Sequence, residues 1–193
     1  MLQRSTFWKV FMSSLDGPQW QDASALFGLI AGAKGLLLEM HPSKPSDYGR
    51  VADHLYGMSA EDRYCRFLSA ISISPAVVEY FVERTASKVT FLAVDEFDKV
   101  AGMVTLVTTG QPGHAEVGMS VTACYRRKGV GSALLDRVVR IASDRGLAVL
   151  QAVTSVQNVP LHQMAVRAGF RPVPYPEDRT LVALQRVVEP ITT

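Results

Sequence analysis

This chain of 193 residues has few cysteines and no closely spaced pair of histidines. Its two cysteines, Cys65 and Cys124, stand 59 residues apart. That spacing fits neither a metal-binding pair nor the dense cysteine framework of a small secreted domain. The four histidines form no HxxxH or HxH pair, so we expect no structural metal. The sequence therefore argues against a fold held together by disulfides or by zinc.

A long hydrophobic run is also missing. The longest apolar stretch lies near residues 23–33, about half of what a membrane-spanning helix needs. Asp16 and Asp22 precede it, and such charges are wrong for a secretory signal peptide. We therefore expect a soluble, cytoplasmic protein with no membrane partner.

A surplus of positive charge is lacking as well, because 20 Lys and Arg against 18 Asp and Glu leave a formal net charge of +2. Domains that bind nucleic acid usually carry a basic surplus over one face. Binding of nucleic acid through the cationic run Arg126–Lys128 is one interpretation of this chain. The near-neutral charge argues against it, and we expect no nucleic-acid partner.

The chain reads as one globular domain with an N-terminal extension. Its 48% of hydrophobic residues is ordinary for a folded protein, and 193 residues are few for two full domains. Within residues 1–34, apolar residues at spacings of three and four predict a helix from Gln19 to Ala33. This extension either covers one edge of the core or serves as a dimerisation or lid element. Residues 35–193 form the main domain.

From Gly35 onwards β-rich runs alternate with amphipathic helical segments, a pattern that predicts a mixed α/β fold. The predicted strands are 36–40, 89–94, 100–108, 115–121, 147–153, 170–173 and 180–187. The predicted helices are 47–56, 59–69, 74–86, 131–145 and 159–168. The long helix between strands 115–121 and 147–153 implies that these two strands are parallel.

The segment Val121–Ser132 carries the strongest functional signal. A strand ends there, three cations follow, and Gly129 and Gly131 lie at the start of a long helix. A helix N-terminus offers unpaired N–H groups and a partial positive charge, and glycines let the main chain approach a ligand closely. The segment therefore predicts a diphosphate site, with the arginines of the run as counter-charge. A solvated surface loop is the alternative interpretation.

The strand predicted at 115–121 has two different faces. Ala115, Val117, Met119 and Val121 share an apolar face, whereas Glu116, Gly118 and Ser120 share the other. A face of acid, glycine and serine leaves room for a ligand. Glu116 is thus a candidate general base that takes a proton from an ammonium substrate, directly or through water. A merely hydrated carboxylate at the rim of the sheet is the alternative.

The order of strand, Arg126-x-x-Gly129-x-Gly131, amphipathic helix, strand, Asn158, helix and Gly169-Phe170 resembles the GNAT family of acyl-CoA N-acyltransferases. The resemblance covers about residues 115–170. The segment Ser59–Phe67 also looks like the start of GNAT domains related to bacterial protein lysine acetyltransferases. The family resemblance implies a mixed, mostly antiparallel central sheet with helices on both faces.

The same resemblance implies an activity and partners. It implies an enzyme that moves an acetyl group from acetyl-CoA, its cosubstrate, to a primary amine on a small molecule or a protein lysine. The amine attacks directly in a ternary complex, rather than through an acyl intermediate on Cys124. No metal takes part, and a homodimer is common in the family.

The site residues are implied by the resemblance as well. Met119 and Val121 pair with the pantetheine arm, and Asn158 contacts the pantetheine region. The amide of Val121 points at the thioester oxygen, where it would stabilise the oxyanion. Arg126 lies beside the main-chain amides expected to hold the coenzyme A pyrophosphate, which are those of Arg127, Lys128, Gly129, Val130, Gly131 and Ser132.

The sequence departs from the family pattern at Ala165. Many GNAT enzymes place a tyrosine five residues before the phenylalanine of the Gly-Phe pair, where it protonates the leaving thiolate. His162 lies on about the same side of the predicted helix and could replace that acid, or it is a surface residue with no role. The departure leaves a second function open, namely an acyl-CoA-binding regulatory module with little catalysis.

Overall fold

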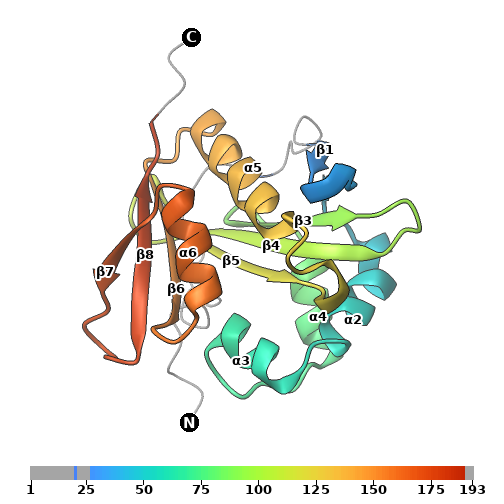
Figure 1. Cartoon of the computed structure of the whole chain (residues 1–193), viewed down its shortest axis with the longest axis horizontal. Coiled ribbons are helices and arrows are strands. Elements are labelled where there is room, and N and C mark those ends of the chain that lie inside the picture. The colour runs from blue at the N-terminus through green and yellow to red at the C-terminus, as the bar shows by residue number, and fades with distance from the viewer. Residues whose placement is uncertain (1–19, 21–26, 190–193) are drawn as a thin grey trace.

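The computed structural model describes Trp20 and residues 27–189 of the chain. In this part the backbone forms one eight-stranded sheet in the order β1-β2-β3-β4-β5-β6-β8-β7, with helices on both faces (Figure 1). Every neighbouring pair of strands is antiparallel except β5 and β6. The predicted fold class is therefore confirmed.

The seven predicted strands and five predicted helices are all present, with their ends shifted by a few residues. The strands are β1 Gly28–Ala31, β2 Leu37–Pro42, β3 Lys88–Val94, β4 Val100–Thr108, β5 His114–Val121, β6 Val149–Ser155, β7 Arg171–Pro174 and β8 Leu181–Val187. The α-helices are α2 Tyr48–Tyr56, α3 Ala60–Phe67, α4 Pro75–Val82, α5 Val130–Asp144 and α6 Val159–Arg167. Short 3₁₀ turns lie at η2 Ala33–Gly35, η3 Pro45–Asp47 and η4 Ala123–Tyr125.

The helix predicted from Gln19 to Ala33 is wrong over Gly28–Ala31. That segment is strand β1, which pairs antiparallel with β2 from Gly28 opposite Met40 to Ala31 opposite Leu37. Apolar spacing in so short a run fits a strand as well as a helix, and pairing with the edge of an existing sheet satisfies the backbone. The main domain thus begins before residue 35. The rest of the expected extension, residues 1–19 and 21–26, lies outside the described residues.

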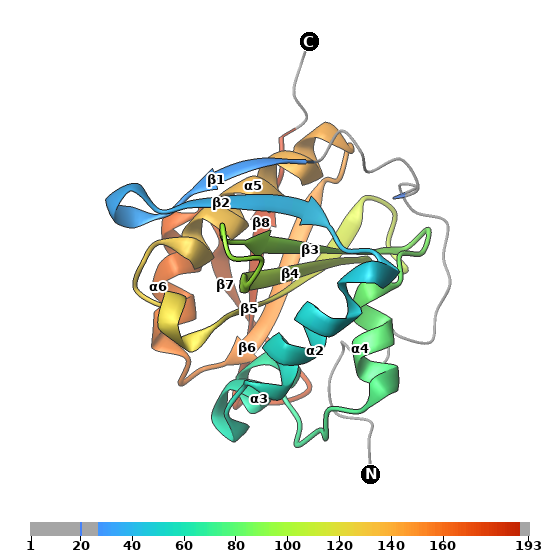
Figure 2. The same ribbon diagram turned by 90° about the vertical axis from the view of Figure 1, so that its right-hand side faces the viewer.

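The sheet separates two apolar clusters. Helices α5 and α6 cover one face, and α2, α3 and α4 cover the other (Figure 2). The core on the first face includes Val104, Leu134 and Ile141, and the core on the second includes Leu55, Phe81 and Met103. Side chains of β4 therefore alternate between the two clusters, as a fully buried central strand requires. In the described part of the chain no helix is long and apolar enough to cross a membrane.

Strands β5 and β6 are joined for only part of their length. They pair in parallel from His114 opposite Val149 to Glu116 opposite Gln151, after which β6 stays paired with β8 and β5 with β4. The crossover through α5 gives this parallel pair, as predicted. Beyond Glu116 the two strands diverge, and the gap between them is the position of the site.

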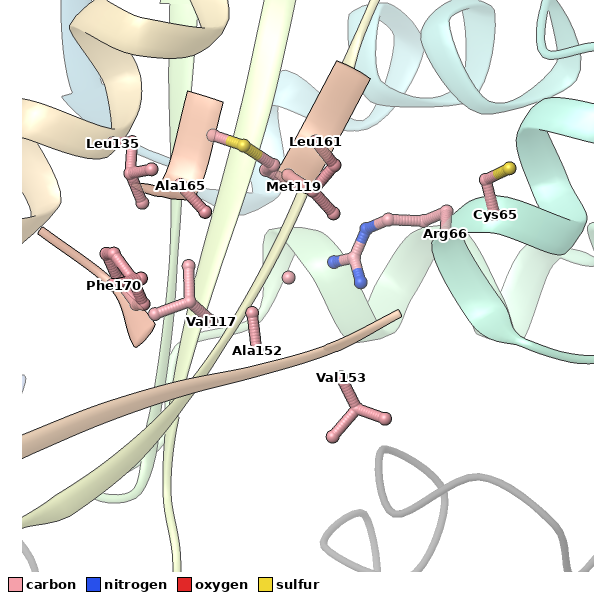
Figure 3. Close-up of a pocket in the computed structure, with 11 residues that line it drawn as sticks. Cys65, Arg66, Val117, Met119, Leu135, Ala152, Val153, Leu161, Ala165 and Phe170 are labelled. Carbon is pink, nitrogen blue, oxygen red and sulfur yellow. The ribbon is translucent and has the colours of Figure 1, made fainter. Parts of the chain in front are cut away.

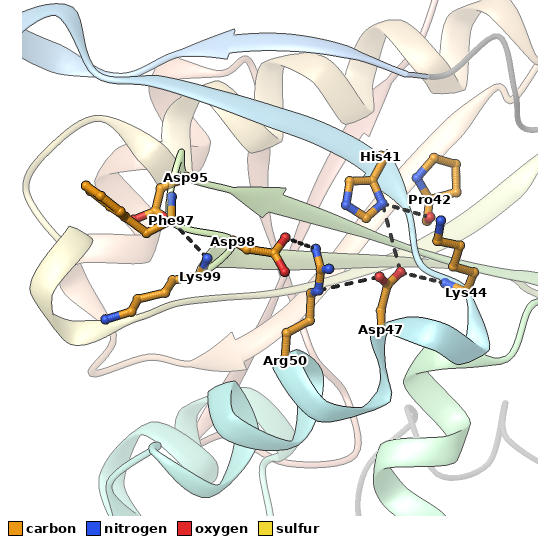
Figure 4. Close-up of polar contacts among 9 residues, drawn as sticks. All are labelled: His41, Pro42, Lys44, Asp47, Arg50, Asp95, Phe97, Asp98 and Lys99. Atoms are coloured by element: carbon orange, nitrogen blue, oxygen red, sulfur yellow. Dashed lines mark hydrogen bonds and ion pairs between the residues drawn. The ribbon is translucent and has the colours of Figure 1, made fainter.

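A buried acid anchors α2 over the sheet. The Asp47 side chain, 1% exposed, accepts a hydrogen bond from the Lys44 N–H at 2.9 Å and pairs with Arg50 at 3.5 Å. Arg50 also pairs with Asp98 in the β3–β4 turn at 2.6 Å, and the His41 ring lies 4.0 Å from Asp47 (Figure 4). These contacts fix α2 to two neighbouring parts of the sheet.

We expect Leu134→Ala to lower the free energy of unfolding by about 2–5 kcal/mol, because it opens a cavity between α5 and β4. Leu134 is fully buried, and its Cδ1 lies only 2.8 Å from where a Cβ on Gly102 would stand. Leu37→Ala is the control: Leu37 is 61% exposed, so its loss should change stability by less than about 0.5 kcal/mol. Urea unfolding measures both, and equal effects would contradict the assignment of the core.

Candidate functional site

A pocket opens where β5 and β6 diverge, and its two ends differ in character. One end is apolar and is formed by Val117, Leu135 and Phe170. At the other end the guanidinium of Arg66 points into the space between Met119 and Ala152 (Figure 3). The pocket therefore crosses the sheet from the apolar α5/α6 side to a cationic α3 side.

The edge of β5 that faces the gap carries main-chain N–H groups that do not bond to β4. Thr109 donates to the His114 carbonyl at 2.9 Å and Thr122 donates to the Ala101 carbonyl at 3.0 Å. Since hydrogen-bonded pairs alternate along an antiparallel ladder, the even-numbered residues of β5 bond to β4. The N–H groups of Met119 and Val121 are thereby turned toward β6, which has already diverged. An extended ligand can add to this edge as a strand would.

The N-terminus of α5 is open in the way the sequence predicts. The first bond of the helix runs from the Ala133 N–H to the Gly129 carbonyl, so the N–H groups of the three residues between them have no partner within the helix. No side chain caps this end, and its first turn contains no acid. Gly129 has φ +77°, and Arg127 before it has φ 59°. The loop is thus shaped and charged for an anion.

The turn between β1 and β2 supports this loop from behind. The Ala33 N–H donates to the Lys128 carbonyl at 2.7 Å. A Cβ on Gly129 would lie 2.9 Å from that same Ala33 nitrogen, and a Cβ on Gly32 would lie 2.6 Å from the Lys128 oxygen. Only glycine fits at either point, because the atoms met are main-chain atoms. The supporting turn lies in the part of the chain that we expected to be a separate extension.

The structure separates the predicted cations of the loop into two groups. Arg126 pairs with Asp62 of α3 at 2.7 Å, and its Nε donates to the Val121 carbonyl at 3.2 Å. Arg127 and Lys128 are exposed, as is Ser132 at the start of α5. The Arg126 charge therefore ties α3 to the end of β5, while Arg127 and Lys128 stay exposed in the loop before α5.

Glu116 is buried, with 7% of its surface exposed. Burial raises the pKa of its carboxyl to about 7, and the nearby positive charge of Arg66 opposes that rise. Among the described residues, its buried Oε2 has no hydrogen-bond partner. At neutral pH such a carboxyl is close to half ionised and can gain or lose a proton.

Arg66 is a site residue that the sequence pattern alone does not predict. It is 8% exposed, its Nη2 lies 3.4 Å from Thr105 Oγ1, and its guanidinium covers Gly118. A Cβ on Gly118 would stand 2.1 Å from Arg66 Nη1, so a larger residue there would displace the Arg66 guanidinium from this position. A glycine inside an otherwise β-rich run was the available signal, since it often marks the close approach of another group.

The predicted residues of α6 have mainly structural contacts. The Asn158 side chain caps the helix by accepting from the Leu161 N–H at 3.3 Å, and its amide donates to Thr154 Oγ1 at 3.1 Å. His162 Nε2 donates to the Ser155 carbonyl at 3.0 Å, so that nitrogen carries the ring proton. Ala165 is 3% exposed and forms part of the pocket wall. Among the described residues, no three His, Cys, Asp or Glu side chains gather as metal ligands would.

The divergence of the two parallel strands and the open N-terminus of α5 thus lie side by side in this protein. In a comparison with known proteins, residues 55–170, more than half of the chain, match the Acetyltransferase (GNAT) family. The protein belongs to that family.

Three relatives illustrate the similarity. YwnH of Bacillus subtilis (strain 168), provisionally named a phosphinothricin acetyltransferase, is 34% identical over 97 residues, which span 48% of this chain and 60% of YwnH. The GNAT domain of S. lividans PAT superposes with a TM-score of 0.78 at 20% identity, covering 85% of this chain and 98% of that one. A structure provisionally described as a phosphinothricin N-acetyltransferase gives a TM-score of 0.63 at 25% identity, covering 79% and 99%.

Glu116 should leave a signature in the pH dependence of stability. Its pKa is raised from 4.5 to about 7, so between these values the folded protein holds a proton that the unfolded chain has released. Stability from this group therefore falls as pH rises from about 4.5 to about 7. His54, whose pKa burial and Arg66 lower to about 4, contributes the opposite slope.

The variant Glu116→Gln removes the contribution of Glu116 to the pH dependence of stability and keeps that of His54. We expect the stability of the wild type relative to Glu116→Gln to decline across that pH window, as measured by urea unfolding at each pH. A difference that stays constant with pH would mean that Glu116 ionises normally.

Proposed function

We propose that the protein is an N-acetyltransferase that moves an acetyl group from acetyl-CoA to a primary amine by direct attack in a ternary complex. The single observation that carries this proposal is the divergence of β5 and β6 beside the open N-terminus of α5. In the gap, the free edge of β5 leads directly to the N-terminus of α5, which is suited to bind an anion. A ligand with an extended arm and a diphosphate group would fit these two features.

That geometry supports a proposal for the residues that would hold acetyl-CoA. The pyrophosphate would lie at the N–H groups from Arg127 to Ser132, with Arg127 and Lys128 supplying positive charge. The pantetheine arm would lie along the β5 edge, on Met119 and Val121. Asn158 contributes indirectly, by capping α6 and so fixing one wall of the gap.

Acetyl transfer to an amine requires a general base and a hydrogen-bond donor to the thioester oxygen. The nitrogen lone pair attacks the thioester carbonyl carbon, the C–S bond breaks, and coenzyme A leaves as the thiolate. The Val121 N–H would stabilise the negative charge that develops on the carbonyl oxygen. Glu116 would take the proton that the amine must lose.

The strand sets a distance between these two groups. Val121 is five residue steps along β5 from Glu116, which is about 16 Å in an extended chain. A carboxylate side chain cannot span that length, so the proton would reach Glu116 through water. The same spacing makes the Met119 N–H, about 10 Å from Glu116, a second candidate donor to the thioester oxygen.

Gly129→Ala should weaken acetyl-CoA binding by about tenfold or more, because a Cβ there is strained at φ +77° and collides with the Ala33 nitrogen. Gly146→Ala is the matched control. Gly146 has φ +67° and follows the far end of α5, and a Cβ added to it would meet nothing within 4 Å. Calorimetric titration with acetyl-CoA compares the two, and equal affinities would remove this loop from the site.

Glu116→Gln should lower kcat by about 100-fold at neutral pH while leaving acetyl-CoA affinity nearly intact. In the wild type, kcat should rise as pH passes through about 7, and the variant should lose that dependence. Glu79→Gln, which changes an exposed carboxylate of α4, is the control. A thiol-release assay over a pH series measures all three proteins, and unchanged turnover in Glu116→Gln would exclude it as the base.

The same assay separates the enzyme from the regulatory module. Release of coenzyme A that requires an amine, with formation of the N-acetyl product, supports the proposal. Tight acetyl-CoA binding with no product across a panel of polyamines, amino acids and a lysine peptide supports the module instead.

A further inference from the structure

A histidine bridges two hydroxyl groups at the end of β5. His54 lies on the buried side of α2, with 7% of its surface exposed. Its Nδ1 is 2.8 Å from Thr122 Oγ1 and its Nε2 is 2.7 Å from Ser120 Oγ. The Thr122 hydroxyl in turn donates to the Val100 carbonyl at 2.7 Å. Both distances from the ring are those of good hydrogen bonds.

These three hydrogen bonds run in series from Ser120 through His54 and Thr122 to the Val100 carbonyl. That carbonyl fixes the direction of each of them. A carbonyl oxygen only accepts, so the single hydroxyl proton of Thr122 is committed to Val100. Thr122 can then only accept from the ring, which places the imidazole proton of neutral His54 on Nδ1. The lone pair of Nε2 therefore accepts the hydroxyl proton of Ser120.

The donor and acceptor roles of the Ser120 hydroxyl are therefore fixed. Its one proton is committed to His54, and the rest of its oxygen can only accept hydrogen bonds. The imidazole does not reverse this near neutral pH, because burial and the positive charge of Arg66 lower the pKa of His54 to about 4. Ser120 itself is half-buried and lies on the same face of β5 as Glu116.

Ser120 stands between the two amides that are candidates for the thioester oxygen. Met119 precedes it and Val121 follows it, and both turn their N–H groups toward the gap. Their side chains belong to the apolar face that packs under α5 and α6, whereas the Ser120 side chain is on the α2/α3 face. On this second face Ser120 is the polar side chain next to both amides, whereas Glu116 is more than 10 Å along the strand.

We infer that the Ser120 hydroxyl oxygen accepts a hydrogen bond from an N–H of the acceptor amine and so orients its lone pair toward the thioester carbon. His54 and Thr122 are positioning residues that keep this oxygen in its acceptor state. The inference rests on the proposed acetyltransferase function and adds to it a specific contact with the acceptor. No proton is transferred to Ser120 or His54, and the acceptor must keep an N–H group as it attacks.

Steady-state kinetics with two substrates tests the contact. With spermidine and a lysine peptide as probe amines, Ser120→Ala should raise the KM of the amine by about fivefold, the worth of one hydrogen bond. The KM of acetyl-CoA should change by less than about twofold. An unchanged amine KM, or an equal rise in both KM values, would overturn the inference.

Thr122→Val and Thr122→Ser form a matched pair for the positioning role. Valine keeps the shape of threonine but cannot accept from Nδ1, so the ring tautomer is released and the amine KM should rise about two- to threefold. Serine keeps the hydroxyl, so the amine KM should stay near that of the wild type. If the two variants behave alike, Thr122 does not set the polarity of Ser120.

The tautomer has a spectroscopic readout that does not depend on turnover. In the wild type at pH 7, ¹⁵N NMR of the His54 ring should show a protonated Nδ1 and an unprotonated Nε2, and Thr122→Val should mix the two forms. A protonated Nε2 in the wild type would overturn the inference while leaving the acetyltransferase proposal intact. If the wild type acetylates neither probe amine nor any other amine of the panel, the proposed function fails and this inference fails with it.

Discussion

The short parallel contact between β5 and β6 is the constraint on which the site depends. Three register pairs join the strands, and each strand then follows its antiparallel neighbour on the other side. A continuous sheet would consume the main-chain groups of β5 as ladder bonds. Because the strands diverge, those groups are left at a gap, and α5 begins at the same end of β5. The proposed binding edge and the proposed anion site therefore both lie where β5 and β6 diverge.

Burial gives the site its electrostatic character. Glu116 and Arg66 reach the α3 side of β5 from different elements, and both are removed from water. Desolvation raises the pKa of the acid to about 7 and lowers the pKa of the arginine to about 10, while the attraction between them opposes both shifts. His54 is kept neutral by the same burial and by the same arginine. The positive charge of Arg66 therefore influences the pKa values of three other groups, Glu116, His54 and Tyr80.

Local sequence signals predicted most of the fold and part of the site. Periodicity located the strands and helices from Gly35 onwards, and the glycines before α5 predicted the loop that we propose as the anion site, since both signals act over a few residues. The strand β1 was mispredicted because a four-residue segment has too few positions to distinguish the two periods. Arg66 and His54 could not be assigned, because each meets β5 only after the helices pack against the sheet.

What the sequence determined alone is therefore local: the alternation that gives β5 one apolar and one polar face, the glycines that permit φ above zero, and the family pattern between residues 115 and 170. Tertiary structure decided which distant groups meet. It tied Arg126 to Asp62 rather than leaving it in the loop, covered Gly118 with Arg66, and brought His54 to Ser120 across 66 residues of chain. Such contacts depend on the docking of helices on a sheet, and the spacing of residues along the chain does not encode that geometry.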